Sequence, residues 1–241
     1  MSGYIVSQHY FDDDLGEVAV RVLSTARRFT ARIRDGIVHV TIPDKVSEAE
    51  YRVLLESMKP RLAAALQRPL SPYHDGYRFE TTDWSFELRR SDSVAPLQIR
   101  SESDANNHMT FLYGSGIDFA DPAHARFMSN CISSRARDFM LDHIVDKAWQ
   151  TAARLGCRPA QIVVSRGLRV LGHCSSRKAV ALSEKIAFLP EDLRMYIITH
   201  ELAHLTQMNH SAAFYALWER YMGCPSGPLK ARLKKFRWPV I

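Results

Sequence analysis

The sequence contains few cysteines, and no two of them are spaced as a metal-binding or redox pair. The four cysteines among 241 residues are Cys131, Cys157, Cys174 and Cys224, so a CxxC motif is excluded. A chain of this length with so few cysteines is also not a disulfide-stabilised scaffold. We therefore expect free thiols and a reducing compartment.

Long apolar runs are also absent. No stretch approaches the about 20 apolar residues of a membrane-spanning helix, which argues against a membrane protein. Residues 1–16 lack the basic start and the apolar core of a signal peptide, and they carry Asp12, Asp13 and Asp14 instead. These absences predict a soluble, cytoplasmic protein. The sequence also shows no internal repeat and no low-complexity segment.

The charge balance is only mildly basic. The formal net charge is +6 and the pI is near 9.2, which is below what a dedicated nucleic-acid-binding protein usually has. Part of the surplus lies near the end of the chain, in Lys230, Arg232, Lys234, Lys235 and Arg237. A solvated helix end is the simpler interpretation of these residues, and a weak contact with nucleic acid is the alternative.

The first part of the chain is rich in predicted strands. Apolar and polar residues alternate, as in half-buried strands, over residues 18–22, 29–33 and 37–42. Asp35-Gly36 between the last two runs predicts a hairpin, because both turn residues then adopt positive φ. A capping box over residues 47–50 begins an amphipathic helix.

The character of the sequence changes after about residue 114. Short strands are expected before this point, over residues 78–80, 84–88, 97–100 and 109–113. Asp121-Pro122 then begins a long helical pattern that runs to about residue 155. Short apolar runs follow at 162–165, 168–171 and 179–182, and two more helices begin at Pro190 and Ser211. We therefore expect a strand-rich N-terminal region with one helix, 1–114, and a catalytic domain, 115–241.

Residues 200–204 form an HExxH motif within the helix predicted after Pro190. Side chains four residues apart share one helix face, so His200 and His204 can point at one metal ion. Glu201 is offset by about 100° around the axis, which places its carboxylate beside the ion and close to a bound water. An accidental motif would bury two unpaired imidazoles and a carboxylate in an apolar segment, which is costly.

A third metal ligand is available at His210. A continuous helix would not return this residue to the metal, but Asn209 tolerates a left-handed conformation and Ser211 can cap the next helix. Three histidines leave one coordination position open, which is typical of catalytic zinc sites. The sequence therefore predicts Zn²⁺ on His200, His204 and His210, with Glu201 as the general base that activates water.

The segment that contains these residues resembles a known family. Residues 189–211, LPEDLRMYIITHELAHLTQMNHS, are similar to the YgjP-like metallopeptidase family, which is related to the SprT-like and WLM zincins. The similarity extends to Gly172-x-Cys174-Ser175, Phe214, the basic last helix and Tyr73-x-Asp75-Gly76. It implies an α+β, zincin-like minimal fold, in which the active-site helix packs on a small β-sheet after a β-rich N-terminal region. It also implies zinc on the three motif histidines and Glu201 as the general base.

One segment departs from the family pattern. The family usually reads Arg-Trp-Gly-Ser-Cys where this chain has Val170-Leu171-Gly172-His173-Cys174. Substrate preference is expected to differ if this strand lines the substrate groove. His173 is a candidate substrate-binding residue or oxyanion donor, and an exposed surface histidine is the simpler interpretation. Cys174 is expected to be a buried thiol.

Other side chains are weaker candidates. Tyr215 and Tyr221 follow the third ligand and could steady a tetrahedral intermediate, although tyrosines on an amphipathic helix more often pack in the core. Asp142, His143 and Asp146 on the long helix suggest a carboxylate that orients a metal histidine. A solvated helix face is the alternative for these three residues.

The residues alone are compatible with three functions. The leading hypothesis is a zinc metallopeptidase that acts on a peptide or protein. A metal-dependent nucleotide pyrophosphohydrolase is the second, because the basic surplus suits an anionic substrate, although no Gly-rich phosphate loop is present. A metal-stabilised, nucleic-acid-associated binding module is the third, and the lack of aromatics among its basic residues counts against it. The oligomeric state is not indicated.

Overall fold

A computed structural model describes residues 6–34, 36–66, 71–166 and 170–241. The chain forms two compact units, Met1–Leu70 and Ser71–Ile241. The boundary expected near residue 114 lies inside the second unit, where the strands before it and the helix after it share one hydrophobic core. The packing therefore divides the chain earlier than composition indicated, directly after the first helix.

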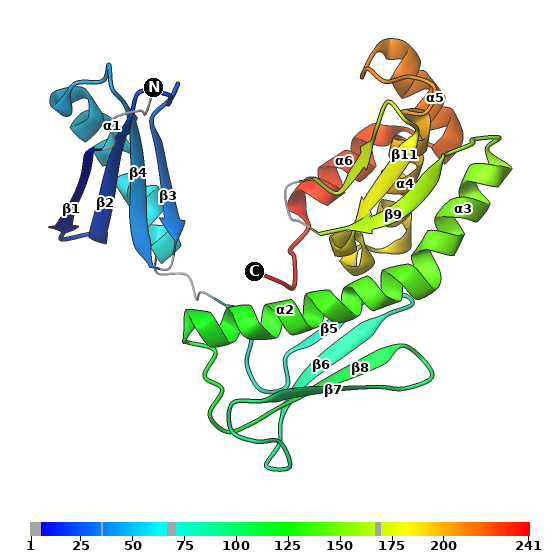
Figure 1. Cartoon of the computed structure of the whole chain (residues 1–241), viewed down its shortest axis with the longest axis horizontal. Helices are drawn as coiled ribbons and strands as arrows, with labels where there is room; N and C mark the ends of the chain where they lie inside the picture. The colour runs from blue at the N-terminus through cyan, green and yellow to red at the C-terminus, as the bar shows by residue number, and fades with distance from the viewer. Residues whose placement is uncertain (1–5, 35, 67–70, 167–169) are drawn as a thin grey trace. The chain divides into compact units, whose positions relative to one another are not determined.

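The first unit is a four-stranded sheet with one helix (Figure 1). Its strands are β1 (Val6–Asp12), β2 (Gly16–Leu23), β3 (Thr30–Arg34) and β4 (Ile37–Pro43), in the order β1-β2-β4-β3. The outer pairs are antiparallel, and β2 runs parallel to β4. Helix α1 (Glu48–Leu66) follows, and its Leu55 and Leu62 pack on Val18, Val38 and Val40 of the sheet.

The local signals of the first unit are confirmed, with one exception. The three predicted strands are β2, β3 and β4, and the capping box is formed, since Glu50 Oε2 accepts a hydrogen bond from the Ser47 backbone N–H at 2.9 Å. Gly36 has the positive φ of a hairpin turn, at 78°, whereas Asp35 lies outside the described residues. Strand β1 was not predicted, because its sequence VSQHYFD lacks a clear apolar face and Phe11 is 79% exposed.

The second unit begins with a sheet of the same topology. Its strands are β5 (Arg78–Glu80), β6 (Ser85–Arg90), β7 (Ile99–Ser103) and β8 (His108–Tyr113), in the order β5-β6-β8-β7. Here too the outer pairs are antiparallel and the inner pair is parallel. A helix again follows the fourth strand. This repeated arrangement of four strands and a helix has no counterpart in the sequence, in which no repeat was found.

The long helix predicted after Asp121 consists of three segments. Helix α2 (Pro122–Phe139) passes through a π-helical turn, Met140–Ile144, into α3 (Val145–Arg154). The sequence pattern predicted one regular helix over this range. The π turn breaks that regularity, because it changes the hydrogen-bond spacing locally. Figure 1 shows α2 lying across the sheet formed by β5 to β8, and both elements contribute to one core.

A three-stranded sheet and three helices complete the second unit. The strands are β9 (Gln161–Ser165), β10 (Gly172–Cys174) and β11 (Ala179–Ser183), in the order β10-β11-β9, with β10 antiparallel to β11. Strands β9 and β11 correspond to the apolar runs at 162–165 and 179–182, whereas β10 was not predicted, and the run at 168–171 lies partly outside the described residues. A 3₁₀ helix, Glu184–Phe188, leads to α4 (Glu191–Ala203), α5 (Ala212–Met222) and α6 (Ser226–Lys235).

The architecture is α+β, as predicted. Helix α4 packs on the small sheet through β10 and β11, and the N-terminal region is rich in strands. Within the described ranges, none of the helices combines the length and the apolarity needed to cross a bilayer. The edge strand β10 and the helix α4 are thus neighbours, and they carry the residues that the sequence singled out.

Candidate metal centre

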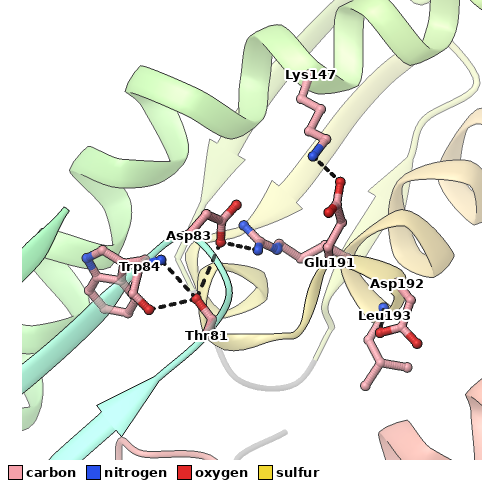
Figure 2. Close-up of polar contacts among 8 residues, drawn as sticks. Thr81, Asp83, Trp84, Lys147, Glu191, Asp192 and Leu193 are labelled. Atoms are coloured by element: carbon pink, nitrogen blue, oxygen red, sulfur yellow. Dashed lines mark hydrogen bonds and ion pairs between the residues drawn. The ribbon is translucent and has the colours of Figure 1, made fainter. Parts of the chain in front are cut away.

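Helix α4 carries the HExxH motif, and ion pairs to three other elements hold its N-terminal end. The pairs are Glu191 with Lys147 of α3, Asp192 with Arg232 of α6, and Arg194 with Asp83 of the β5–β6 turn. Figure 2 shows the Lys147–Glu191 pair and places Asp83 beside Thr81 and Trp84. Because the partners come from distant parts of the second unit, the N-terminal end of α4 is tied to three other elements.

Arg194 is the buried member of this set. Only 1% of its surface is exposed, and its guanidinium lies 6.0 Å from the ring centroid of Phe139. Within the described part of the chain, its Nε and Nη1 atoms have no hydrogen-bond partner. Asp83, whose side chain is 37% exposed, is therefore the counter-ion of the buried Arg194.

Three imidazoles meet at the C-terminal end of α4. His200 and His204 lie one turn apart, and the chain then turns back to His210. Ser211 caps α5 as predicted, because its Oγ accepts a hydrogen bond from the Phe214 N–H at 3.3 Å. The Nε2 atom of His200 lies 3.1 Å from Nε2 of His204 and 3.1 Å from Nε2 of His210.

This spacing fits a shared divalent ion. Two nitrogens bound tetrahedrally to one zinc are about 3.3 Å apart, given a Zn–N distance of about 2.0–2.1 Å. Without an ion, His200 Nε2 carries at most one proton and can donate to only one of its two neighbours. Burial lowers the pKa of His200 to about 4, and His204, His210 and Lys230 act in the same direction. The ring is therefore neutral at pH 7, which is the form that binds metals.

Aromatic rings enclose His200. The ring centroids of Trp218 and Phe214 lie 4.5 Å and 4.9 Å from that of His200. The indole N–H of Trp218 donates a hydrogen bond to Thr199 Oγ1 at 3.1 Å, which fixes the plane of the indole. Helix α5 therefore supplies an apolar wall that restricts rotation of the imidazole.

A backbone carbonyl, rather than a carboxylate, orients His204. Its Nδ1 lies 3.0 Å from the backbone oxygen of Gln207, which leaves Nε2 for the metal. Burial lowers the pKa of His204, although the hydrogen bond to Gln207 opposes this effect. Among the described residues, Asp142 and Asp146 make no contact with the metal histidines, so the suggested carboxylate partner is wrong. Asp142 instead lines a cavity beside Trp84.

Glu201 lies between α4 and the edge strand β10. Its side chain is buried, and burial raises its pKa to about 7. A Cβ atom placed on Gly172 would lie 2.6 Å from both Cγ and Oε1 of Glu201. This distance is far below van der Waals contact, so only glycine leaves room for the carboxylate at this position.

The two residues after Gly172 on β10 point to opposite faces of the strand. His173 is exposed, and repulsion between the two imidazoles contributes to the lowered pKa of His204, after burial and His210. Cys174 is buried, as expected. Burial raises the pKa of its thiol, and the negative charge of Glu201 raises it further. The segment that departs from the family pattern therefore lies beside the candidate metal centre.

The two tyrosines on α5 lie in different surroundings. The ring centroid of Tyr215 lies 6.3 Å from that of His210, and 37% of the residue is exposed. The hydroxyl of Tyr221 instead lies 3.4 Å from Cys157 Sγ. Tyr215 therefore lies beside the candidate ligand His210, whereas Tyr221 belongs to a separate polar contact.

Sequence reasoning missed two residues that shape the site. Gly172 entered only through the family resemblance, without a role, although a glycine inside a short strand is a signal of close backbone approach. Trp218 was not named as a site residue. Its contact with His200 depends on how α5 crosses α4, which no local pattern encodes.

A solved structure, the crystal structure of the metallopeptidase zymogen of Pyrococcus abyssi abylysin, matches 40% of this chain and 97% of its own chain, with 22% identity and a TM-score of 0.35. No curated protein matches the chain. A family model described as YgjP-like, metallopeptidase domain, matches residues 27–235, which include the three histidines and Glu201. The chain therefore belongs to the YgjP-like metallopeptidase family, whose members are metal-dependent peptidases.

Proposed function

We propose that the protein is a zinc-dependent peptidase whose metal is held by His200, His204 and His210. The observation that carries this proposal is the approach of His200 Nε2 to within 3.1 Å of both other Nε2 atoms. Nitrogen donors from three histidines are a ligand set that suits zinc. Three ligands also leave a position for water or substrate.

The proposed chemistry assigns the proton transfers to Glu201. A zinc ion held by the triad would lower the pKa of a bound water to about 7 and polarise the scissile carbonyl. Glu201 follows His200 directly in the sequence, and its carboxylate is confined between α4 and β10. We assign it the role of accepting the proton of the attacking water and later donating a proton to the leaving amine.

His173 and Tyr215 are the proposed substrate contacts. Both are exposed, one on β10 and the other on α5. Each can donate a hydrogen bond to a substrate carbonyl oxygen as negative charge develops on it. We also propose that the protein acts in the cytoplasm, since all four cysteines are free, as is usual in reducing compartments.

The experiment combines metal analysis with activity on two substrate classes. Zinc content is measured on the purified protein and on His204→Ala, and turnover is measured on casein, a peptide library and ATP. We expect about one zinc per chain, lost in His204→Ala, and cleavage of peptides rather than ATP. ATP hydrolysis without peptide cleavage would instead support a nucleotide pyrophosphohydrolase.

The role of Glu201 is tested with a pair of matched variants. Glu201→Gln should retain zinc and lose activity by at least about a hundredfold, as expected for removal of a general base. Glu191→Gln removes a carboxylate from the same helix, in an ion pair with Lys147, and should stay active. Normal turnover by Glu201→Gln would show that the general-base assignment is wrong.

A further inference from the structure

One phenylalanine, Phe214, contacts all three histidines of the candidate metal centre. Its ring centroid lies 4.9 Å from that of His200, 4.5 Å from that of His204 and 4.8 Å from that of His210. The three imidazole centroids are themselves 4.7–5.0 Å apart. Because the four spacings are nearly equal, Phe214 lies on one side of the plane through the imidazole centroids and covers that face of the triad.

The ring of Phe214 meets the imidazoles in two ways. It stacks on His204, with an angle of 28° between the ring planes, and it meets His200 and His210 edge to face, at 72° and 71°. Both arrangements are favourable for aromatic rings at these distances. Rotation of any one imidazole about its Cβ–Cγ bond would disturb its contact with this ring.

Phe214 is itself held firmly in place. Its side chain is fully buried, and its ring centroid lies 5.7 Å from that of Trp218. Its backbone N–H donates to Ser211 Oγ at 3.3 Å, in the cap that begins α5 directly after His210. The same short segment therefore places both the third histidine and the ring that contacts it.

His210 is the histidine that depends most on this contact. It is exposed, and among the residues that the structure describes its imidazole has one hydrogen-bond contact, with His200 Nε2. A metal would replace that contact, because both nitrogens would then bind the ion. Outside the triad, its ring contacts Phe214 at 4.8 Å and Tyr215 at 6.3 Å. Without Phe214, the imidazole would lose rotational freedom only when the metal binds, which weakens binding.

We propose that Phe214 is a positioning residue, which holds the three imidazoles in their metal-binding arrangement before the metal enters. This inference rests on the proposed function, because it concerns the same metal site. Ligands that are already ordered lose less conformational freedom on binding. The affinity of the protein for zinc therefore depends on the ring of Phe214, although this ring offers the metal no donor atom.

The test compares Phe214→Leu with the matched control Phe111→Leu. Phe111 is also fully buried in the second unit, but it lies on β8 and its ring packs on Phe86. Both substitutions remove a buried ring, so both should lower the midpoint of urea unfolding. The Kd for zinc is measured by competition with a chelator while each variant is folded. We expect it to rise about 10- to 100-fold in Phe214→Leu and to change by less than about twofold in Phe111→Leu.

Substitution with Co²⁺ gives a second readout, which a general loss of stability does not move. Four-coordinate cobalt absorbs visible light more strongly than six-coordinate cobalt. Water should replace a misplaced imidazole in Phe214→Leu and reduce this absorbance, whereas Phe111→Leu should keep the native spectrum. If Phe214→Leu is too unstable, Phe214→Met and Phe111→Met provide the same comparison, because the longer side chain adapts to fill the space.

Metal binding is measured apart from turnover, so that this inference and the peptidase function can fail separately. Zinc affinity that depends on Phe214, in a protein that cleaves no peptide, would support the inference and contradict the peptidase. Equal zinc affinity in the two leucine variants, or native cobalt absorbance in folded Phe214→Leu, would overturn the inference and leave the peptidase function intact. Absence of zinc binding by the native protein would overturn both.

Discussion

Substitution of Gly172 by alanine should displace the carboxylate of Glu201. The added Cβ would lie 2.6 Å from Cγ and Oε1 and 2.8 Å from Cδ, all atoms of the same side chain. Ordinary van der Waals contact begins near 3.4 Å, so the strand or the carboxylate must move by about 0.8 Å. Glu201 is buried on α4, which limits how far it can retreat.

The expected effects on stability and on catalysis differ in size. Overpacking of this kind costs about 1–3 kcal/mol in the free energy of unfolding. A displacement of about 1 Å at a catalytic group can lower turnover about a hundredfold. The atoms in closest contact with the added Cβ all belong to Glu201, so Gly172→Ala should retain its metal. We therefore expect a large decrease in kcat at unchanged zinc content and nearly unchanged KM.

Gly227→Ala is the matched control, because a Cβ there meets nothing within 4 Å and the backbone is unstrained. Zinc content, kcat, KM and urea unfolding are measured for both variants. Tryptophan fluorescence reports the second unit alone, since all four tryptophans lie beyond residue 70. A folded, zinc-loaded Gly172→Ala protein with kcat within twofold of the control would refute the steric argument.

Three further predictions address the surroundings of the site. Asp83→Ala should lower the free energy of unfolding by about 2–4 kcal/mol, because the buried Arg194 loses its counter-ion, and adding Arg194→Met should recover part of the loss. Equal urea midpoints for the single and double variants would contradict this. Zinc should alter the emission of Trp218, whose ring lies 4.5 Å from a proposed ligand, and a change of equal size in Trp218→Phe would assign it to another tryptophan. Iodoacetamide should modify Cys174 slowly at pH 8, as followed by mass spectrometry, because burial and Glu201 raise its thiol pKa and so reduce the thiolate fraction. Glu201→Gln should accelerate this reaction, and an unchanged rate would argue against the charge effect.

The HExxH motif could be interpreted from sequence because its geometry is local. The spacing of His200 and His204 places both on one helix face in any helix, and Ser211 caps the next helix wherever that helix lies. Capping, hairpin and alternation patterns likewise predicted the start of α1 and the approximate bounds of β2 and β4. The strands that were missed, β1 and β10, lie at sheet edges; β1 lacks a clear apolar face, and β10 has only three residues.

The boundary between the two units and the surroundings of the triad depended on tertiary packing. Composition changes near residue 114, but the sheet before this point and α2 bury the same core, so the division falls at residue 70. Nothing local indicates that Gly172 faces Glu201 or that Trp218 faces His200.

The sequence by itself thus determined which side chains can meet a metal, because residues on one helix keep their relative positions. Tertiary structure decided what surrounds them. The contacts of β10, α5 and α6 with α4 join residues distant in sequence, and they arise from the burial of a shared apolar core rather than from any short-range preference.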